Sequence, residues 1–495
     1  MAVRVVSTVP MATPEARYAG NDRLLVGMIL GVLTFWLFAQ STLNIAPDMQ
    51  RDLGIGAGTL TGAVAAAALF SGIFIVVMGG LADRFGRMRI LRLGFVLGIA
   101  GSLLVGLAPA GSLGTGMLLL GRALQGLSAA CIMPASLALV KAYWDGAARQ
   151  RAVSLWSIGS WGGAGLCSLV GGLMSQNLGW RSIFWLAIAV SALGLWLMRG
   201  TPENKAETTG DYKFDLPGVL AFMVAMLALQ VLVTQGNTLG WTSPAVLGLI
   251  AATLVFGALF VVIERHSANA FFDFRLFGNS TYTGATISNF LINATAGTLI
   301  VSLQLVQLGG GMNAQQAGML TLGYAIAIIA FIRVGEKLLQ RFGPRQPMIW
   351  GCLITGLAIA LLMPTQLMLG QYTILAVIGY SLFGLGLAFY ATPSTDAALS
   401  NLPAAQGGSG SGIYKMASSL GAAFGVAISA AVFTALAGDS GSVRWLEGVI
   451  TFAGRQDNLA VREAAFVALG FNVLMVVAAI VSIVLTVPRG RKTSD

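Results

Sequence analysis

Long apolar segments recur along almost the whole chain, and each is about as long as a helix that crosses a bilayer. A membrane-spanning helix needs roughly 20 mainly apolar residues. Fourteen such segments can be marked: 24–46, 58–80, 90–109, 115–142, 152–175, 182–199, 216–236, 243–264, 280–307, 314–337, 347–364, 371–395, 407–437 and 464–487. Backbone groups in lipid must hydrogen-bond within their own segment, so continuous runs of this length indicate helices rather than barrel strands. We therefore expect an all-α integral membrane protein.

The basic residues indicate the orientation of these helices. The loops that alternate from the N-terminus hold most of the arginines and lysines. The other loops hold only Arg51, Arg181, Arg444, Arg455 and Arg462. Positive loops stay on the cytoplasmic side, so we expect both termini in the cytoplasm and a multi-pass protein of the inner (cytoplasmic) membrane. Orientation also explains the net charge of +10 better than nucleic-acid binding does, because no basic domain or aromatic-interleaved basic patch is present.

An internal repeat predicts two related halves. Leu81-Ala-Asp-Arg-Phe-Gly86 recurs as Leu338-Leu-Gln-Arg-Phe-Gly343, once after the second span and once after the tenth. If each copy follows the second helix of a six-helix unit, two units flank two inserted helices. The expected boundaries are 1–23 for a cytoplasmic N-terminus, 24–199 and 280–487 for the bundles, 200–279 for a linker with the inserted pair, and 488–495 for a cytoplasmic tail.

The stretch GGLADRFGRMRIL at 79–91 gathers charges between two apolar spans. By itself it can be a solvated loop that orients the chain. Its pattern also resembles the loop signature of the major facilitator superfamily, G-x-L-a-D-R-x-G-R. The resemblance implies a conformational latch between two six-helix bundles, formed by Gly80, Asp83, Arg84, Gly86 and Arg87, with Arg341 in the second copy. The second copy has Gln340 where the first has its acid.

Two further segments resemble motifs of the same superfamily. Gly121-Arg122-Ala-Leu-Gln125-Gly126 resembles the R-x-x-Q-G motif, whose arginine is implicated in proton coupling, although a purely structural arginine is the alternative. Residues 163–172 resemble the antiporter motif of the fifth span, but Cys167-Ser168 stands where Gly-Pro is usual. Small residues still allow close helix packing there.

The chain as a whole resembles the fourteen-span drug:proton antiporters, and within them the quinolone and multidrug exporters of the NorB type. The segments TFWLFAQS (34–41), LSAACIMPA (127–135), TGATISNFL (283–291), YATPSTDAAL (390–399) and GIYKMASSLGAAFGVA (412–427) carry the resemblance. It implies proton-driven efflux of amphipathic small-molecule drugs by a monomer in the bilayer, without a cofactor. Export of an endogenous metabolite or siderophore is the alternative. An enzyme is disfavoured because HExxH and GxSxG are absent.

The acid that such exporters often carry in the first span is missing here. The stretch Ala39-Gln40-Ser41-Thr42-Leu43-Asn44 contains no carboxylate. The remaining candidates for proton coupling are Asp396, then Glu336, with Arg122 and Lys415. Each has a plainer reading: Asp396 can be a helix-end acid, Glu336 can pair with Arg333 one turn away, and Lys415 can snorkel or pair with an acid.

Aromatic and amide side chains suggest where cargo would bind. The candidates for the cavity are Trp36, Phe38, Gln40, Asn44, Gln125, Asn289, Asn293, Gln304 and Tyr390. Such a lining suits a large, flat, amphipathic ligand. Without an acid in the first span, we expect zwitterionic, neutral or anionic drugs more than dications.

Two other features are best explained by helix packing. The cysteines Cys131, Cys167 and Cys352 all lie inside apolar spans without a CxxC pattern, so we expect packing residues and no metal or disulfide. The sequence GGSGSG at 407–412 has the composition of a flexible linker. Because it opens the thirteenth span, we expect close helix packing instead.

Overall fold

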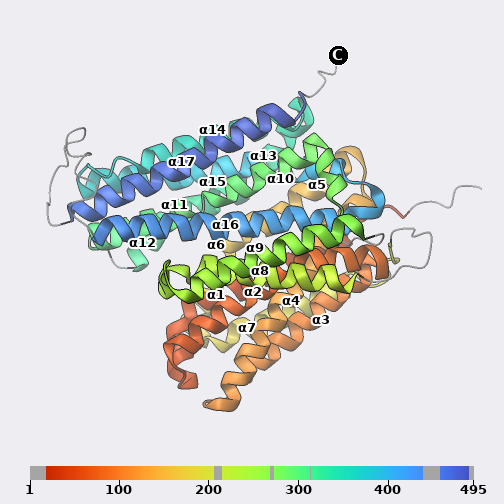
Figure 1. Ribbon diagram of the computed structural model, residues 1–495, viewed down its shortest axis with the longest axis horizontal. Coiled ribbons are helices and arrows are strands. Elements are labelled where there is room, and N and C mark those ends of the chain that lie inside the picture. The colour runs from red at the N-terminus through yellow and green to blue at the C-terminus, as the bar shows by residue number, and fades with distance from the viewer. Residues whose placement is uncertain (1–17, 206–214, 268–271, 313, 439–457, 490–495) are drawn as a thin grey trace, which may run out of the picture.

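The computed structural model describes residues 18–205, 215–267, 272–312, 314–438 and 458–489, and every regular element in these ranges is a helix. The helices run roughly along the long axis of the molecule (Figure 1). The α-helices are α1 (Asp22–Leu53), α2 (Ala57–Phe85), α3 (Arg87–Gly106), α4 (Ser112–Tyr143), α5 (Gly146–Ser157), α6 (Gly163–Leu178), α7 (Arg181–Leu197), α8 (Leu216–Leu239), α9 (Pro244–His266), α10 (Ser280–Ala294), α11 (Gly297–Gln304), α12 (Ala314–Leu320), α13 (Leu322–Phe342), α14 (Arg345–Leu362), α15 (Leu369–Ser400), α16 (Gly407–Gly438) and α17 (Leu459–Thr486). Short segments join them: the π-helical η1 (Ile158–Gly162) and η3 (Leu305–Gly309), and the 3₁₀ turns η2 (Phe274–Gly278) and η4 (Ala404–Gln406).

Each of the fourteen predicted spans falls on one helix or on consecutive helices. The spans at 152–175, 280–307 and 314–337 combine α5–η1–α6, α10–α11–η3 and α12–α13. Within the described ranges, 11 helical segments are long and apolar enough to cross a membrane, and α7 is a shorter apolar helix. The all-helical membrane architecture is confirmed, and the described helices are consistent with fourteen crossings.

The helices pack as two groups. In the N-terminal group, α1–α7, helices α2 and α3 both pack on α4, and α1 packs on α6 and α7. In the C-terminal group, α10–α17, helices α13 and α14 pack on α15, and α10 and α16 pack on α17. Figure 1 shows the second group above the first. The groups meet where α16 lies on α2 and α4, and where α5 lies on α13 and α15.

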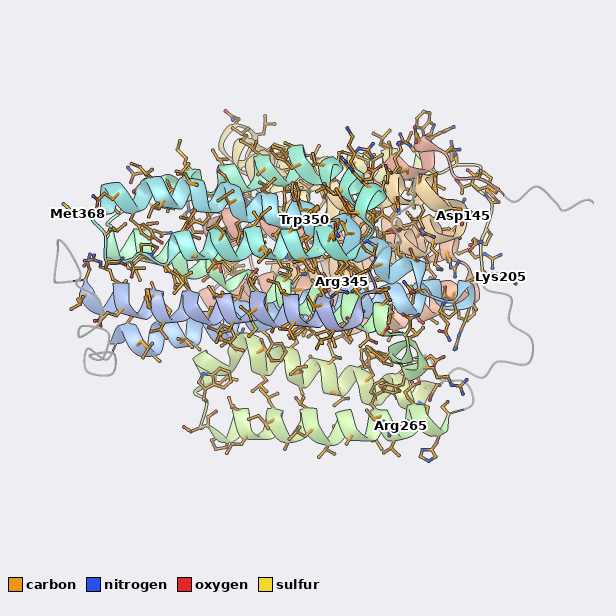
Figure 2. All side chains as sticks on the ribbon, turned by 90° about the horizontal axis from the view of Figure 1, so that it is seen from above. Asp145, Lys205, Arg265, Arg345, Trp350 and Met368 are labelled. Atoms are coloured by element: carbon orange, nitrogen blue, oxygen red, sulfur yellow. The ribbon has the colours of Figure 1, made fainter. Side chains whose placement is uncertain are left out.

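Helices α8 and α9 form a pair at the side of this body. They pack on each other, and α8 also contacts α2 and α16 (Figure 2). The outer helix α9 exposes apolar side chains, among them Leu254 (67%) and Val255 (62%). An exposed apolar face of this kind suits lipid. The pair therefore covers the outer side of the seam between α2 and α16 without entering either group.

The two copies of the Leu-x-x-Arg-Phe-Gly sequence end corresponding helices. Gly86 follows α2 with φ 121°, and Gly343 follows α13 with φ 73°. Glycine adopts this left-handed region without the steric cost that other residues meet. Each copy thus stops the second helix of its group and turns the chain into the next.

Charged residues gather at one end of the helices. Figure 2 shows Asp145, Lys205 and Arg265 near one end and Met368 at the opposite end. A cleft of about 690 Å³ at the first end is lined by residues that include Arg87, Lys141, Asp145, Arg149 and Lys205. We refer to this end as the basic end.

The span at 152–175 contains an irregularity that the sequence did not predict. A π-helical turn, η1, separates α5 from α6. Such turns place one extra residue in a helical turn and occur often at functional sites. The irregularity lies upstream of Ser168, the position at which the antiporter motif carries proline, and it brings Ser160 and Trp161 to the junction of the two groups.

Candidate functional site

The carboxylate of Asp83 joins the two helix groups at the basic end. Asp83 lies in the last turn of α2. Its oxygens accept hydrogen bonds from the backbone N–H of Gly408 (2.7 and 2.9 Å) and of Ser409 (2.9 Å). These donors belong to the first turn of α16, where N–H groups lack intrahelical partners and the helix dipole favours an anion. A buried acid of the N-terminal group, 4% exposed, therefore caps a helix of the C-terminal group.

Arg87 holds this carboxylate from the other side. Its Nε and Nη2 donate to Oδ1 of Asp83 at 2.9 and 2.8 Å. Its remaining contacts reach Oδ1 of Asn204 (2.7 Å) and the carbonyl of Ala404 (2.7 Å). Charge-assisted hydrogen bonds are stronger than neutral ones. One guanidinium thus connects α3, the segment after α7 and the residues just before α16.

The other predicted latch residues have different surroundings. Gly80 is buried in α2, and Gly86 forms the turn after it. Arg84 interacts electrostatically with Asp83 and also with Asp215 and Glu264 of the inserted pair. Arg341 is exposed at the end of α13, where it lies over the ring of Phe342 at 5.2 Å. The first copy of the motif makes the contact between the groups, and the described contact of Arg341 stays within α13.

A second contact between the groups lies beside the first. Arg149 of α5 donates from Nε to Oδ1 of Asp396 (3.0 Å) and from Nη2 to Oγ of Ser400 (2.8 Å). Nearby, Nζ of Lys141 donates to the carbonyl of Leu399 (2.5 Å). Asp396, predicted as a proton-coupling residue, is therefore a buried acid in an ion pair that bridges α5 and α15. We call the contacts of Asp83 and of Asp396 together the latch.

We expect Arg149→Gln and Asp396→Asn to lower the initial rate of transport by similar factors, roughly tenfold. Each removes one partner of a buried pair, which costs the closed form about 1–3 kcal/mol. A double-mutant cycle on transport rates in membrane vesicles is the measurement. The double variant should be no slower than the slower single variant.

The control for this cycle is Arg151→Gln. Arg151 lies on the same helix, but its main partner is Asp22 inside the N-terminal group (2.6 Å), and both side chains are exposed. Its electrostatic interaction with Glu336 of the other group is weaker than that with Asp22. The pair of Arg151 and Asp22 lowers the pKa of the Asp22 carboxyl below its usual value through the hydrogen bond and charge of Arg151. Its loss should hardly change the rate. Additive effects of Arg149→Gln and Asp396→Asn would contradict a shared contact.

Lys415 lies at the junction of the groups, away from the basic end of α16. It is eight residues into the helix, about 12 Å along its axis at 1.5 Å per residue. Its Nζ donates to Oγ of Ser160 (3.0 Å) and lies 5.2 Å from the ring centre of Trp156. Lys415 is 8% exposed, and Trp156 is fully buried. A cation of one group thus faces a hydroxyl and an indole ring of the other.

Tyr390 belongs to a hydrogen-bonded network in the C-terminal group. Its hydroxyl bonds Oγ of Ser288 (2.7 Å) and accepts from Oγ of Ser394 (3.0 Å). Asn289 donates to the carbonyl of Tyr414 (2.9 Å). Asn293 in turn donates to Oδ1 of Asn289 (2.9 Å). Three predicted cavity residues therefore lie on α10 and α15, next to Tyr414 of α16. Gln304 is half-buried at the end of α11.

Aromatic side chains of the N-terminal group approach this network. Trp161 packs edge-on against Tyr390, with ring centres 6.3 Å apart. The indole N–H of Trp36 donates to the carbonyl of Ser160 (3.1 Å). The side chains of Phe38, Gln40 and Asn44, predicted for the same cavity, lie outside the described residues.

Arg122 and Gln125 are both completely buried in α4. Nε of Arg122 donates to the carbonyl of Ala63 in α2 (3.0 Å), and Nη1 donates to Oε1 of Gln125 (2.9 Å). Gln125 reaches Oγ of Ser102 at 3.4 Å. A buried arginine in a membrane span is costly and is held by such contacts. These bonds tie α2, α3 and α4 together inside the N-terminal group.

Glu336 pairs within its own helix. It accepts from Arg333, one turn earlier, and from Nε2 of Gln340 (3.3 Å). The side chain is 4% exposed. Its position on α13 places it in the C-terminal group, and it interacts electrostatically with Arg151 of the N-terminal group.

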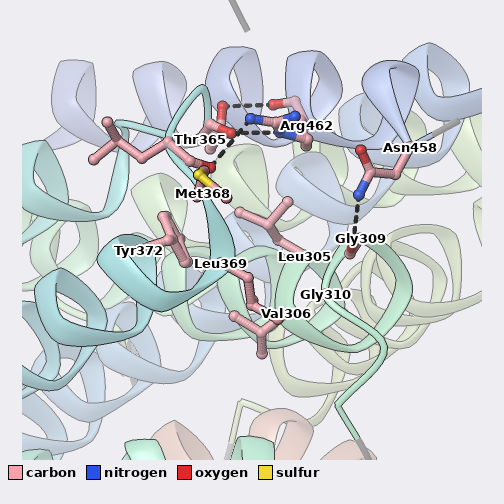
Figure 3. Close-up of a pocket in the computed structure, with 11 residues that line it drawn as sticks. Leu305, Val306, Gly309, Gly310, Thr365, Met368, Leu369, Tyr372, Asn458 and Arg462 are labelled. Atoms are coloured by element: carbon pink, nitrogen blue, oxygen red, sulfur yellow. Dashed lines mark hydrogen bonds between the residues drawn. The ribbon is translucent and has the colours of Figure 1, made fainter. Parts of the chain in front are cut away.

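A well-formed pocket lies far from these residues, near the end opposite the basic end. Figure 3 shows this cavity, of about 250 Å³, between η3, the start of α15 and the start of α17. Its walls are mainly apolar. Arg462 is turned to the backbone, donating to the carbonyls of Thr365 (2.6 Å) and Leu367 (3.1 Å). None of the predicted cavity residues lines it.

Comparison with known proteins decides the family. The model of the Major Facilitator Superfamily matches residues 25–425. The chain belongs to the major facilitator superfamily. It is 44% identical to the quinolone resistance protein NorB of Staphylococcus aureus (strain COL) over 476 residues, which cover 96% of this chain and 98% of that protein. For NorB of strain MRSA252 the identity is 46% over 444 residues, 88% of this chain and 95% of the relative.

Solved structures agree on the superfamily fold. The proton:xylose symporter XylE matches with a TM-score of 0.63 at 16% identity, over 94% of this chain and 96% of that chain. The human organic anion transporter MFSD10 (TETRAN) matches with a TM-score of 0.58 at 15% identity, over 93% of this chain and 98% of that chain. The family match and the NorB relatives indicate that the chain is a membrane transporter rather than an enzyme.

Some residues of this site were not among the sequence predictions. From the sequence, Arg149 and Lys141 are only orienting charges, and nothing singles out Ser160 and Trp156. The available signal for Arg149 was its place in 146–157, a short segment with two arginines that leads into an apolar span. Nothing in the sequence indicated the π-helical turn that directs Ser160 towards Lys415.

Proposed function

We propose that this chain exports amphipathic drugs of the quinolone and multidrug type across the inner membrane, driven by the proton gradient. The NorB relatives, similar over nearly the whole chain, support the drug class. We further propose a monomer in which the basic end and both termini face the cytoplasm. The bundles are 24–199 and 280–487, joined by 200–279.

The latch at the basic end is the observation that supports alternating access. Asp83, Arg87, Arg149 and Asp396 hold the two helix groups together there. The Asp83–Arg87 pair lies within the N-terminal group. The other contacts of these residues join the two groups or reach the segment after α7. A path to the cytoplasm would open only when they separate. These contacts support a transporter that is closed on the proposed cytoplasmic side.

We assign proton coupling first to Asp396 and then to Glu336, and Arg122 and Lys415 are the remaining candidates. Only the ionised form of Asp396 attracts Arg149 strongly. Loss of a proton to the cytoplasm would therefore favour closure of the basic end. Gaining the proton would weaken the pair and favour opening. This links the direction of the proton to the state of the latch.

Purified protein in liposomes tests the proposal. Vesicles with an acidic interior should accumulate a quinolone such as norfloxacin, and collapse of the pH gradient should stop accumulation. Asp396→Asn should uncouple accumulation from the gradient, whereas Asp22→Asn, an exposed acid in the N-terminal group, should leave it intact. Unchanged coupling in Asp396→Asn would remove that residue from its role. Wild-type vesicles that move divalent biocides but not quinolones would contradict the proposed cargo.

A further inference from the structure

The acids near the junction of the two helix groups are already paired. Asp83 pairs with Arg87, Asp396 with Arg149 and Glu336 with Arg333. In the part of the chain that the structure describes, Lys415 forms no ion pair. Its contacts are the hydroxyl of Ser160 and the ring of Trp156. Burying a charge is costly unless it is compensated, so this uncompensated ammonium points to an anion that arrives from elsewhere.

The neighbours of Lys415 define what kind of anion would fit. Trp156 lies beside the ammonium, and the indole N–H of Trp36 donates a hydrogen bond to the backbone carbonyl of Ser160. The next residue, Trp161, packs on Tyr390 of the C-terminal group. Indole and phenol rings offer flat apolar surfaces for another ring system. A single cation bordered by such rings suits a planar aromatic molecule that carries one carboxylate.

Ser160 is a weak partner that such a carboxylate can replace. The ammonium has three N–H donors, and one of them is used by a neutral hydroxyl. A carboxylate forms a charge-assisted bond, which is roughly twice as strong as a neutral one. Lys415 lies on α16 and Ser160 on η1, so the exchange occurs across the surface where the two groups separate.

We propose that Lys415 binds the carboxylate of planar aromatic substrates, and that the hydroxyl of Ser160 and the ring of Trp156 hold its ammonium when no substrate is bound. The inference rests on the proposed function and names the substrate class of that site. Lys415 is then a specificity-determining residue rather than a proton carrier.

Transport of a matched substrate pair tests this. Liposomes containing wild type, Lys415→Met or Lys415→Arg take up norfloxacin or its methyl ester, in which the carboxylate is blocked. We expect Lys415→Met to raise the KM for norfloxacin at least tenfold and to change the KM for the ester less than twofold. Lys415→Arg should restore much of the difference. The control is Lys337→Met, a lysine exposed on α13, which should leave both values unchanged.

The contrary outcomes are separable. If Lys415→Met raises the KM for norfloxacin and for its ester equally, Lys415 acts in structure or coupling. If it changes neither KM, Lys415 has no role in recognition. Either result overturns the inference. If wild type moves neither compound, the proposed function fails by itself. Quenching of tryptophan fluorescence by 2-naphthoate in detergent then decides the inference. Wild type should bind 2-naphthoate at least tenfold more tightly than 2-naphthamide, and Lys415→Met should bind both alike; equal binding by wild type overturns it.

Discussion

Asp83→Asn is expected to lower transport at least about a hundredfold without preventing insertion of the protein into the membrane. The substitution removes the charge that Arg87 and the first turn of α16 share, and it leaves the guanidinium of Arg87, 3% exposed, without its carboxylate. Breaking a buried ion pair in this way costs about 3–5 kcal/mol, and each 1.4 kcal/mol changes an equilibrium tenfold. The closed form of the basic end would then be sparsely populated.

Two measurements check this result. The rate of drug transport in vesicles reports the loss of function. The labelling rate of a cysteine introduced at Leu402, which is 5% exposed and lines the cleft at the basic end, reports opening and should rise. The control is Arg89→Gln, because Arg89 is exposed and lies 3.9 Å from Glu203. Normal transport by Asp83→Asn would mean that the transport cycle does not require the contacts of the latch.

Gly79→Leu is expected to abolish transport by holding the basic end open. Gly79 in α2 and Gly408 in α16 approach so closely that a Cβ on either one would collide with the backbone oxygen of the other. The obstacle is backbone rather than a flexible side chain, so the two helices would have to move apart. Asp83, one turn further along α2, would then lose its contacts with Gly408 and Ser409. We expect less than about 1% of the wild-type transport rate.

Binding separates this effect from misfolding. Gly79→Leu should still bind drug from the cytoplasmic side, seen as tryptophan quenching in detergent, while vesicle transport is lost. Gly257→Leu is the matched control: Gly257 lies in α9 with open space around it, so the same change should leave both measurements unaltered. Transport by Gly79→Leu within a fewfold of wild type would refute close approach of α2 and α16 as a required step.

The segment GGSGSG at 407–412 shows which features the local sequence predicts and which depend on packing. Its composition is that of a flexible linker, yet its place at the start of an apolar span predicted a packed helix, and α16 does begin at Gly407. The sequence predicts this closely packed helix because glycine allows backbones to approach closely inside a membrane. It could not show that the partner is α2, or that the acid at 83 caps the helix.

Lys415 and Asp396 illustrate the same limit within the candidate site. Both were singled out because charges in apolar spans are costly and hence functional by default. Their roles depend on Ser160 and Arg149, residues that lie 255 and 247 positions away along the chain. No local pattern specifies such a pair. Arg341 shows the converse, since it repeats the motif of Arg84 but lies exposed over Phe342.

The sequence by itself determined that this protein is a bundle of membrane-spanning helices, roughly where those helices lie along the chain, and which stretches carry charge. These properties follow from hydropathy and from backbone hydrogen bonds that close within each helix. Only the tertiary structure decided which charges meet across the two groups and that a π-helical turn brings Ser160 to Lys415. The physical reason is that the stability of a single helix in lipid depends on the hydropathy of its own segment, whereas an ion pair between helices depends on how distant segments pack.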